Sequence, residues 1–239
     1  MKDMSMTPSA TSCDAVVLLS GGLDSTVLLH HVRKATASVA ALCIDYGQRH
    51  RREMECARFQ ADAAGARSFL TLDMSAVSVF LTQASVLMEH GAEVPPLDAL
   101  SAADRSHPPT YVPNRNMMLL SVAVAYAESL GACCVYYGAQ AQDEYGYWDC
   151  TEAFLNRINS LLALNRGNVV TVEAPLINNA KADNVRLGLE LGVDFSKTWS
   201  CYQGKETACG VCPTCVERLN AFQSLRVKDP LPYAVPPKQ

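Results

Sequence analysis

Short apolar runs alternate along the chain with longer segments in which apolar residues recur at helical spacing. Five runs are too short for helices and fit buried strands: residues 15–19, 39–44, 68–72, 133–137 and 169–172. Helical spacing is found over residues 24–34, 49–64, 116–130, 151–164 and 179–191, and a glycine directly follows three of these segments. This alternation predicts an α/β fold with a doubly wound, mostly parallel sheet.

Two segments interrupt the alternation. Residues 74–113 have mixed composition and two Pro-Pro pairs, and because a connection this long is usually functional or mobile, we expect it to form a lid-like insertion. The proline-containing tail, residues 228–239, is predicted to be extended and poorly ordered, like residues 1–12. The expected organisation is an α/β domain over residues 13–197, followed by a small segment over residues 198–226.

Composition narrows the class of protein. Hydrophobic residues make up 49% of the 239 residues and charged residues 18%, so the chain can bury a core and is not disordered. There is no apolar run long enough for a transmembrane helix, and the polar N-terminus does not resemble a signal peptide, so we expect a cytoplasmic protein without membrane contact. The net charge of −4 argues against broad nucleic-acid binding.

Four of the ten cysteines crowd together near the C-terminus. Cys201, Cys209, Cys212 and Cys215 follow a C-x7-C-x2-C-x2-C pattern. Four thiolates with such short loops surround one tetrahedral Zn²⁺, although an iron–sulfur cluster or a catalytic thiol would use the same residue type. We favour a structural Zn²⁺ site, because no cysteine in the set is spare for chemistry.

A glycine-rich stretch lies where the first predicted strand turns into the first predicted helix. Glycines let the backbone approach an anion closely, and free N–H groups at a helix start favour negative charge. Hydroxyl groups add donors, and Asp24 is placed to hold Mg²⁺ against phosphates. The stretch lacks the Gly-Lys-Ser/Thr of a Walker loop. It resembles the pyrophosphatase loop of ATP pyrophosphatases and predicts ATP contacts from Leu19, Ser20, Gly21, Gly22, Leu23, Asp24, Ser25 and Thr26.

Further motifs extend the resemblance to one family. Y-G-Q-R-H at residues 46–50, V-P-N-R-N at 112–116, T-W-S-C-Y at 198–202 and the cysteine cluster resemble the 7-cyano-7-deazaguanine synthases, from about Val16 to about Asn220. The resemblance implies an adenine nucleotide alpha hydrolase-like, pyrophosphatase-loop fold in a homodimeric, zinc-containing ligase. Such an enzyme activates the carboxylate of 7-carboxy-7-deazaguanine with ATP and Mg²⁺, forms an amide with ammonia, and dehydrates it to a nitrile used in queuosine synthesis.

The resemblance and the positions of residues in the predicted fold together suggest site residues. Arg115 at a helix start and Lys181 near a strand end are the candidate catalytic cations that hold the phosphates or the carboxylate, because ligands collect at this edge of open α/β sheets. Tyr46 and Gln48 join the ATP contacts. The expected substrate contacts are Arg49, His50, Asn116, Asp143, Tyr147, Trp148 and Asp149.

Two departures from the family pattern keep alternatives open. Asn114 stands where the family usually has glycine, and residues 141–151 read A-Q-D-E-Y-G-Y-W-D-C-T where it usually reads E-T-D-x-S-G-Y-P-D-C-R. The lost arginine removes a potential carboxylate partner. One alternative is therefore a paralogue that adenylates a related deazapurine acid and joins it to another amine, such as a protein N-terminus. A tRNA thiolase or a zinc-ribbon nucleic-acid binder is the other.

Overall fold

The chain folds around one parallel β-sheet. The computed structural model describes residues 13–49, 52–101, 103–104, 107–141, 146–167 and 169–235, and within them five strands lie in the order β3-β2-β1-β4-β5. Their bounds are β1 (Ala15–Leu18), β2 (Val39–Asp45), β3 (Ser68–Asp73), β4 (Cys134–Tyr136) and β5 (Thr171–Glu173), and all neighbouring pairs are parallel. The five predicted strands and the parallel sheet are confirmed.

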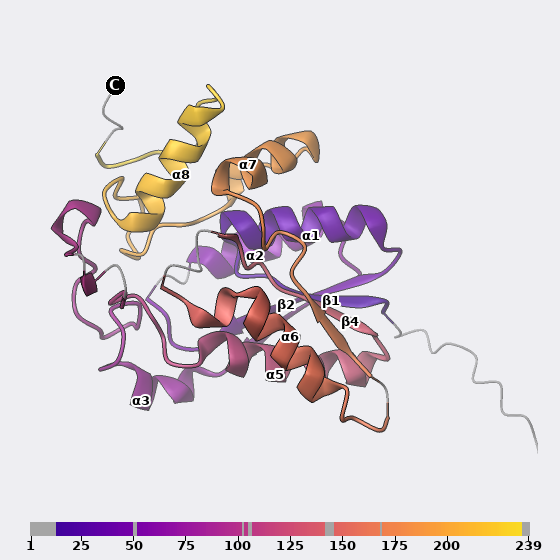
Figure 1. Cartoon of the computed structure of the whole chain (residues 1–239). Helices are drawn as coiled ribbons and strands as arrows, with labels where there is room; N and C mark the ends of the chain where they lie inside the picture. Colours follow the sequence, from indigo (N-terminus) through magenta and orange to yellow (C-terminus); the bar gives the residue numbers. More distant parts are fainter. Residues whose placement is uncertain are drawn as a thin grey trace, which may run out of the picture.

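Helices cover both faces of the sheet (Figure 1). One face carries α1 (Leu23–Ala35), α2 (Arg52–Ala63) and α7 (Lys181–Glu190), with α8 (Pro213–Ser224) packed on α7. The other face carries α5 (Arg115–Leu130) and α6 (Glu152–Leu162). The prediction of a doubly wound sheet is therefore confirmed.

The core splits into two layers because successive side chains of a strand point to opposite faces. Val16 and Leu42 belong to the apolar cluster beneath α5 and α6. Val17 and Ala41 belong to the cluster beneath α1, α2, α7 and α8. Burial on both faces explains why the central strands are apolar runs without polar alternation.

Two details differ from the predicted helices. Within the helix expected over residues 49–64, the described helical residues are Arg52–Ala63, and the backbone N–H of Arg49 donates to the Leu87 carbonyl of the insertion. Helix α8 was not predicted, since the cysteine spacing indicated a loop-rich metal segment. Cys212 is its N-cap and Pro213 is its first residue. Proline is favoured at the first position of a helix because its missing N–H needs no partner there.

The insertion at residues 74–113 carries short helices and buried side chains. Its elements are η1 (Ser75–Val77), α3 (Ser78–Leu81) and η2 (Leu97–Ala99). Leu87 and Met88 are buried, and Met88 pairs with Gln48 in an antiparallel bridge. These contacts attach the insertion to the residues that follow β2. Its movement as a lid stays a prediction.

Part of the C-terminal tail is folded, which corrects the expectation of an extended, poorly ordered segment. Asp229 is buried and accepts hydrogen bonds from Arg218 Nε at 2.7 Å and Nη2 at 2.9 Å. The Tyr233 hydroxyl donates to the same carboxylate at 2.6 Å. Burying a charge without a partner is costly, so this ion pair fixes residues 229–233 against α8.

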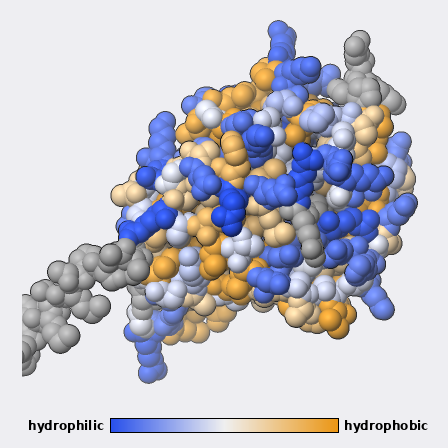
Figure 2. All heavy atoms as spheres, turned by 180° about the vertical axis from the view of Figure 1, so that it is seen from behind, coloured by the Kyte–Doolittle hydropathy of each residue, from blue (hydrophilic) through white to orange (hydrophobic). Residues whose placement is uncertain are grey.

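Among the described residues, no helix is both long and apolar enough to cross a membrane. On the face opposite to that in Figure 1, hydrophilic and hydrophobic side chains are intermixed (Figure 2).

Candidate active site and metal centre

A cavity of about 310 Å³ opens at the carboxyl ends of the central strands. It lies where β1 has β2 on one side and β4 on the other, the point in an open α/β sheet at which ligands bind. Its walls come from the loop after β1, the residues after β2 and β4, the starts of α5 and α7, and the segment before α8. The polar lining residues include Ser20, Asp24, Ser25, Gln48, Glu53, Thr110, Arg115, Asn116, Lys181, Ser200, Thr214 and Glu217.

The loop after β1 is held in shape by its own hydroxyls. Ser20 Oγ and Ser25 Oγ lie 2.9 Å apart, and the backbone N–H of Gly22 donates to Ser20 Oγ at 3.2 Å. Gly21 has a φ of +85°, and a Cβ on it would lie 2.0 Å from the carbonyl oxygen of Glu53 in α2. Only glycine therefore lets the loop pass this closely beneath α2.

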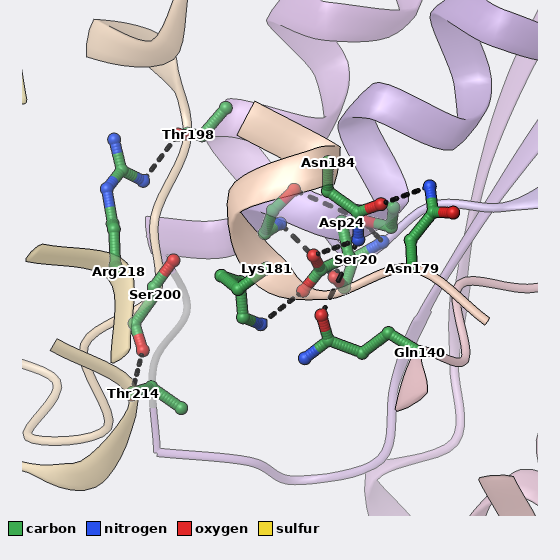
Figure 3. A network of polar contacts seen from close by, with 12 residues as sticks. Ser20, Asp24, Gln140, Asn179, Lys181, Asn184, Thr198, Ser200, Thr214 and Arg218 are labelled. Carbon is green, nitrogen blue, oxygen red and sulfur yellow. Dashed lines mark hydrogen bonds and ion pairs between the residues drawn. The ribbon is translucent and has the colours of Figure 1, made fainter. Parts of the chain in front are cut away.

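Asp24, Lys181 and Asn184 form one polar network beside this loop (Figure 3). Lys181 Nζ donates to Asp24 Oδ2 at 2.7 Å, and Asn184 Nδ2 donates to Asp24 Oδ1 at 2.9 Å. Asn179 Nδ2 in turn donates to Asn184 Oδ1 at 3.0 Å. Both carboxylate oxygens of Asp24 are thus oriented from α7, which sets a cation and an anion side by side at the cavity wall.

Arg115 provides a second cation in the lining of the same cavity. Burial lowers the pKa of Arg115, but its electrostatic interactions with neighbouring titratable groups, Tyr46 and Tyr202 first among them, together outweigh burial and leave the pKa above its ordinary value. The hydroxyl of Tyr46 also accepts a hydrogen bond from Arg115. A permanently charged guanidinium lined by phenol groups is suited to hold the carboxylate of a flat, aromatic ligand.

The residue before Arg115 explains one departure from the family pattern. Asn114 has a φ of +52°, in the left-handed region. Glycine adopts this region freely, and asparagine tolerates it better than most other residues. The substitution of asparagine for glycine therefore preserves the turn that places Arg115.

The structure brings most of the predicted site residues together. Of the predicted ATP, substrate and catalytic residues, those that line the cavity are Leu19, Ser20, Gly22, Leu23, Asp24, Ser25, Tyr46, Gln48, Arg115, Asn116, Tyr147 and Lys181. Gly21 and Thr26 support the loop from behind; Thr26 is fully buried.

Three predicted substrate contacts lie elsewhere. Arg49 donates to the carbonyls of Gly91 and Ala92 at 2.7 and 2.8 Å, so its guanidinium braces the insertion. Trp148 is 45% exposed, because its indole N–H donates to the Tyr111 hydroxyl and its ring packs on α6. Asp149 is buried and accepts from the backbone N–H of Asn116 at 3.1 Å, an interaction that caps α5.

Two further predictions cannot be placed, because His50 and Asp143 lie outside the described residues.

Several cavity residues were missed from sequence. Glu53, Leu87, Thr110 and Tyr202 line the cavity, and Thr110 Oγ1 lies 2.6 Å from the Tyr147 hydroxyl. Tyr202 was part of a recognised motif and could have been included on that ground. Glu53 and Thr110 carry no local signal, since only packing of α2 and of the insertion brings them to the site. Burial raises the pKa of Glu53 to about 8, although Arg115 partly opposes the shift.

The four predicted metal ligands converge. The sulfur atoms of Cys201, Cys209, Cys212 and Cys215 all lie within 4.8 Å of one another. Backbone N–H groups point at two of them: that of Cys209 donates to Cys201 Sγ at 3.3 Å, and that of Cys212 donates to Cys209 Sγ at 3.3 Å. Such donors stabilise thiolate, so the donor set fits a tetrahedral Zn²⁺.

The cluster of four cysteines is joined directly to the cavity. The indole N–H of Trp199 donates to the carbonyl of Cys201 at 3.0 Å, and the backbone N–H of Trp199 donates to the Gly21 carbonyl at 3.0 Å. Thr214 Oγ1 donates to the Ser200 carbonyl at 2.6 Å (Figure 3). Folding of the cysteine segment therefore fixes one wall of the cavity and one end of the loop.

The fold and the loop define a protein of the pyrophosphatase-loop class. An NMN synthetase from Francisella tularensis superposes with a TM-score of 0.50 at 16% identity, covering 91% of this chain and 74% of that one. A 4-thiouridine synthetase, solved as an RNA complex with bound ATP, gives a TM-score of 0.50 at 19% identity over 90% of this chain and 51% of that one. At these identities the likeness establishes the fold alone.

The sequence comparisons identify the family. A family model described as "Queuosine biosynthesis protein QueC" matches residues 14–226, and the chain belongs to this family. Two relatives are named 7-cyano-7-deazaguanine synthase. That from Clostridium kluyveri is 39% identical over 92% of this chain and 97% of its own length, and that from Psychromonas ingrahamii is 41% identical over 91% and 96%. These relatives lend no support to the amide-forming or nucleic-acid-binding alternatives.

Proposed function

We propose that this protein is an ATP-dependent ligase that converts 7-carboxy-7-deazaguanine and ammonia, through an amide, to 7-cyano-7-deazaguanine. The observation that carries the proposal is the arrangement of one cavity in a chain of this family. The loop with Lys181 and the guanidinium of Arg115 with its neighbouring tyrosines line this one cavity.

The loop with Lys181 and the Arg115 group are proposed to serve different parts of the reaction. A carboxylate is a poor electrophile, but its adenylate has a good leaving group, and adenylation of the amide oxygen permits dehydration in the same way. The loop N–H groups and Lys181 are proposed to neutralise the phosphates of ATP. Arg115 is proposed to hold the acid, while Tyr46 and Tyr147 line the position of its ring system. Side chains thus act mainly by positioning and charge stabilisation.

Two metals complete the proposal. Asp24 presents a carboxylate to the cavity beside the loop and would hold the Mg²⁺ that accompanies ATP, which supplies charge neutralisation at the phosphates. The four cysteines would hold a structural Zn²⁺ that stabilises the segment from Trp199 to α8. A homodimer, implied by the family resemblance, is expected in light scattering of the purified protein.

Product analysis tests the proposal. The protein is incubated with 7-carboxy-7-deazaguanine, ATP, Mg²⁺ and ammonium. The products are then separated and identified by mass spectrometry. Nitrile, AMP and pyrophosphate are expected, and all three should disappear when the acid is omitted. Accumulation of the amide without nitrile would contradict the nitrile-forming assignment, and failure to consume ATP would contradict the substrate assignment.

A further inference from the structure

The side chain of Glu53 lines the cavity beside the loop that follows β1. Glu53 belongs to the first turn of α2, and its Oε1 lies 3.9 Å from the position that a Cβ on Gly22 would take. The charge of Arg115 acts on the same carboxyl group, and Glu53 is part of the cavity lining. Glu53 therefore lies beside the loop and within the electrostatic field of the second cation.

This part of the cavity is where the reacting carbon must lie. An acyl-adenylate is held by the loop through its phosphate and by Arg115 through the acyl part, so the carbon that joins the two parts lies between these anchors. The nitrogen that attacks this carbon arrives from the remaining space of the cavity. A carboxylate that lines the cavity beside the loop and within the electrostatic field of Arg115 is placed to reach that nitrogen.

Both halves of the reaction release protons from nitrogen. In the first half, ammonia attacks the acyl carbon, a C–N bond forms, the C–O bond to AMP breaks, and the nitrogen gives up one proton. In the second half, ATP adenylates the amide oxygen with loss of pyrophosphate. The C–O bond then breaks as the carbon–nitrogen triple bond forms, AMP leaves with that oxygen, and the nitrogen gives up two protons.

We propose that Glu53 is a catalytic residue that accepts these protons. The inference rests on the proposed ligase function. Arg115 and Lys181 are cations and cannot accept a proton. Among the other carboxylates that line the cavity, Asp24 is oriented by Lys181 and Asn184 and is assigned to Mg²⁺, and Glu217 belongs to α8, on the wall formed by the cysteine segment. Glu53 is a carboxylate whose position adjoins the bond that forms.

The surroundings of Glu53 suit an acceptor that works near neutral pH. It is faced by Arg115 from α5, by Cys43 and Tyr46 from β2 and the turn after it, and by Cys56 from its own helix. Burial raises the pKa of Glu53 to about 8. A base of this strength is efficient because it is partly ionised at working pH and holds the proton firmly once transferred.

The test separates adenylation from the nitrogen steps. Glu53→Gln keeps the shape but cannot accept a proton, and Glu55→Gln removes an exposed carboxylate from the same helix as a control. Acid-dependent ATP–pyrophosphate exchange reports adenylation, which releases no proton from nitrogen. Amide formation in a single turnover, and conversion of supplied 7-amido-7-deazaguanine to nitrile, report the two nitrogen steps.

For Glu53→Gln we expect exchange within about threefold of wild type and both nitrogen steps slowed at least about 100-fold. Glu55→Gln should resemble wild type throughout. Glu53→Asp retains a proton acceptor and should recover part of both nitrogen steps, which a purely structural role would not allow. At a constant concentration of free NH3, the rise of the amidation rate between pH 6 and about 8 should be lost in Glu53→Gln.

Three results would overturn the inference. Unchanged nitrogen steps in Glu53→Gln would exclude a proton-accepting role. Equal loss of exchange and amidation in both Glu53 variants would assign the residue to ATP binding or folding instead. A wild-type protein that shows no acid-dependent exchange would overturn the proposed function as well, and this outcome is recognised without any variant.

Discussion

Lys181 and Asp24 form an ion pair of 2.7 Å between the first turn of α7 and the first turn of α1. The two side chains are 12% and 20% exposed, so the pair is largely shielded from solvent while it faces the cavity. Asp24 lies inside the pyrophosphatase loop, and Lys181 begins a helix more than 150 residues later along the chain. The pair therefore joins the two halves of the sheet at the point where phosphates are proposed to bind.

Replacing Lys181 should abolish adenylation with little loss of fold. Lys181→Met is expected to slow acid-dependent ATP–pyrophosphate exchange by about 100- to 1,000-fold, because one charged donor to the phosphates is lost. Lys34→Met, which removes an exposed lysine at the far end of α1, is the matched control. Exchange within threefold of wild type in Lys181→Met would contradict a role in phosphate binding.

Two glycines with the same backbone conformation should respond differently to substitution. Gly21 and Gly192 both have positive φ, +85° and +74°, so alanine at either position costs about 1–2 kcal/mol of backbone strain. A Cβ on Gly192 would meet open space, whereas one on Gly21 would lie 2.0 Å from the Glu53 carbonyl oxygen. Gly21→Ala should therefore destabilise the protein by about 1–3 kcal/mol more than Gly192→Ala.

Chemical denaturation of both variants measures this difference. Equal free energies of unfolding for Gly21→Ala and Gly192→Ala would show that α2 does not pack against the loop as described.

Removing the metal should loosen the segment after Trp199. Structural zinc contributes folding free energy directly, and each kcal/mol lost lowers the Tm of a chain of this size by about 2–4 °C. Cys212→Ser is expected to lose bound zinc and lower the Tm, while Cys133→Ser, at an exposed cysteine outside the cluster, should do neither. Elemental analysis and thermal unfolding measure both effects, and full zinc content in Cys212→Ser would contradict the assigned ligand set.

Glu53 should make stability depend on pH. Burial raises its pKa in the folded protein from 4.5 to about 8, so the folded state keeps a proton that the unfolded chain has already released. The contribution of this carboxyl to stability is fully present below about pH 4.5 and is lost as the pH rises toward 8. Glu53→Gln, which does not titrate, should therefore become progressively more stable than wild type over this range.

The expected difference at pH 8 is about 2–4 kcal/mol, after allowing for the partial solvent contact of the side chain. Urea unfolding of both proteins between pH 4.5 and 8 measures it. A difference in free energy that stays constant over this range would show that the Glu53 pKa is not raised.

The sequence predicted the features whose cause is local. Buried strands of a parallel sheet are continuous apolar runs, and the loop from Ser20 to Thr26 is a contiguous motif, so both could be recognised without knowledge of packing. The convergence of the four cysteines could be predicted for the same reason. All of these features depend on residues that are close together in the chain.

The rest of the site depends on tertiary contacts that leave no local pattern. Arg49 was predicted to bind substrate, but the carbonyls of residues 91 and 92 capture its guanidinium. Trp148 was predicted to line the pocket, but its hydrogen bond to Tyr111 holds it at the surface. Glu53 was missed because only the passage of α2 over Gly21 turns it toward the cavity.

Oxygen tracing tests the central claim most directly. The acid is prepared with both carboxylate oxygens as ¹⁸O and is converted by the protein with ATP and ammonium. The ¹⁸O content of the AMP is then measured by mass spectrometry. If both the acid and the amide are activated as adenylates, each C–O cleavage leaves one acid-derived oxygen on AMP. The account therefore predicts two molecules of singly labelled AMP for each nitrile formed. Unlabelled AMP, or label released into water, would contradict it.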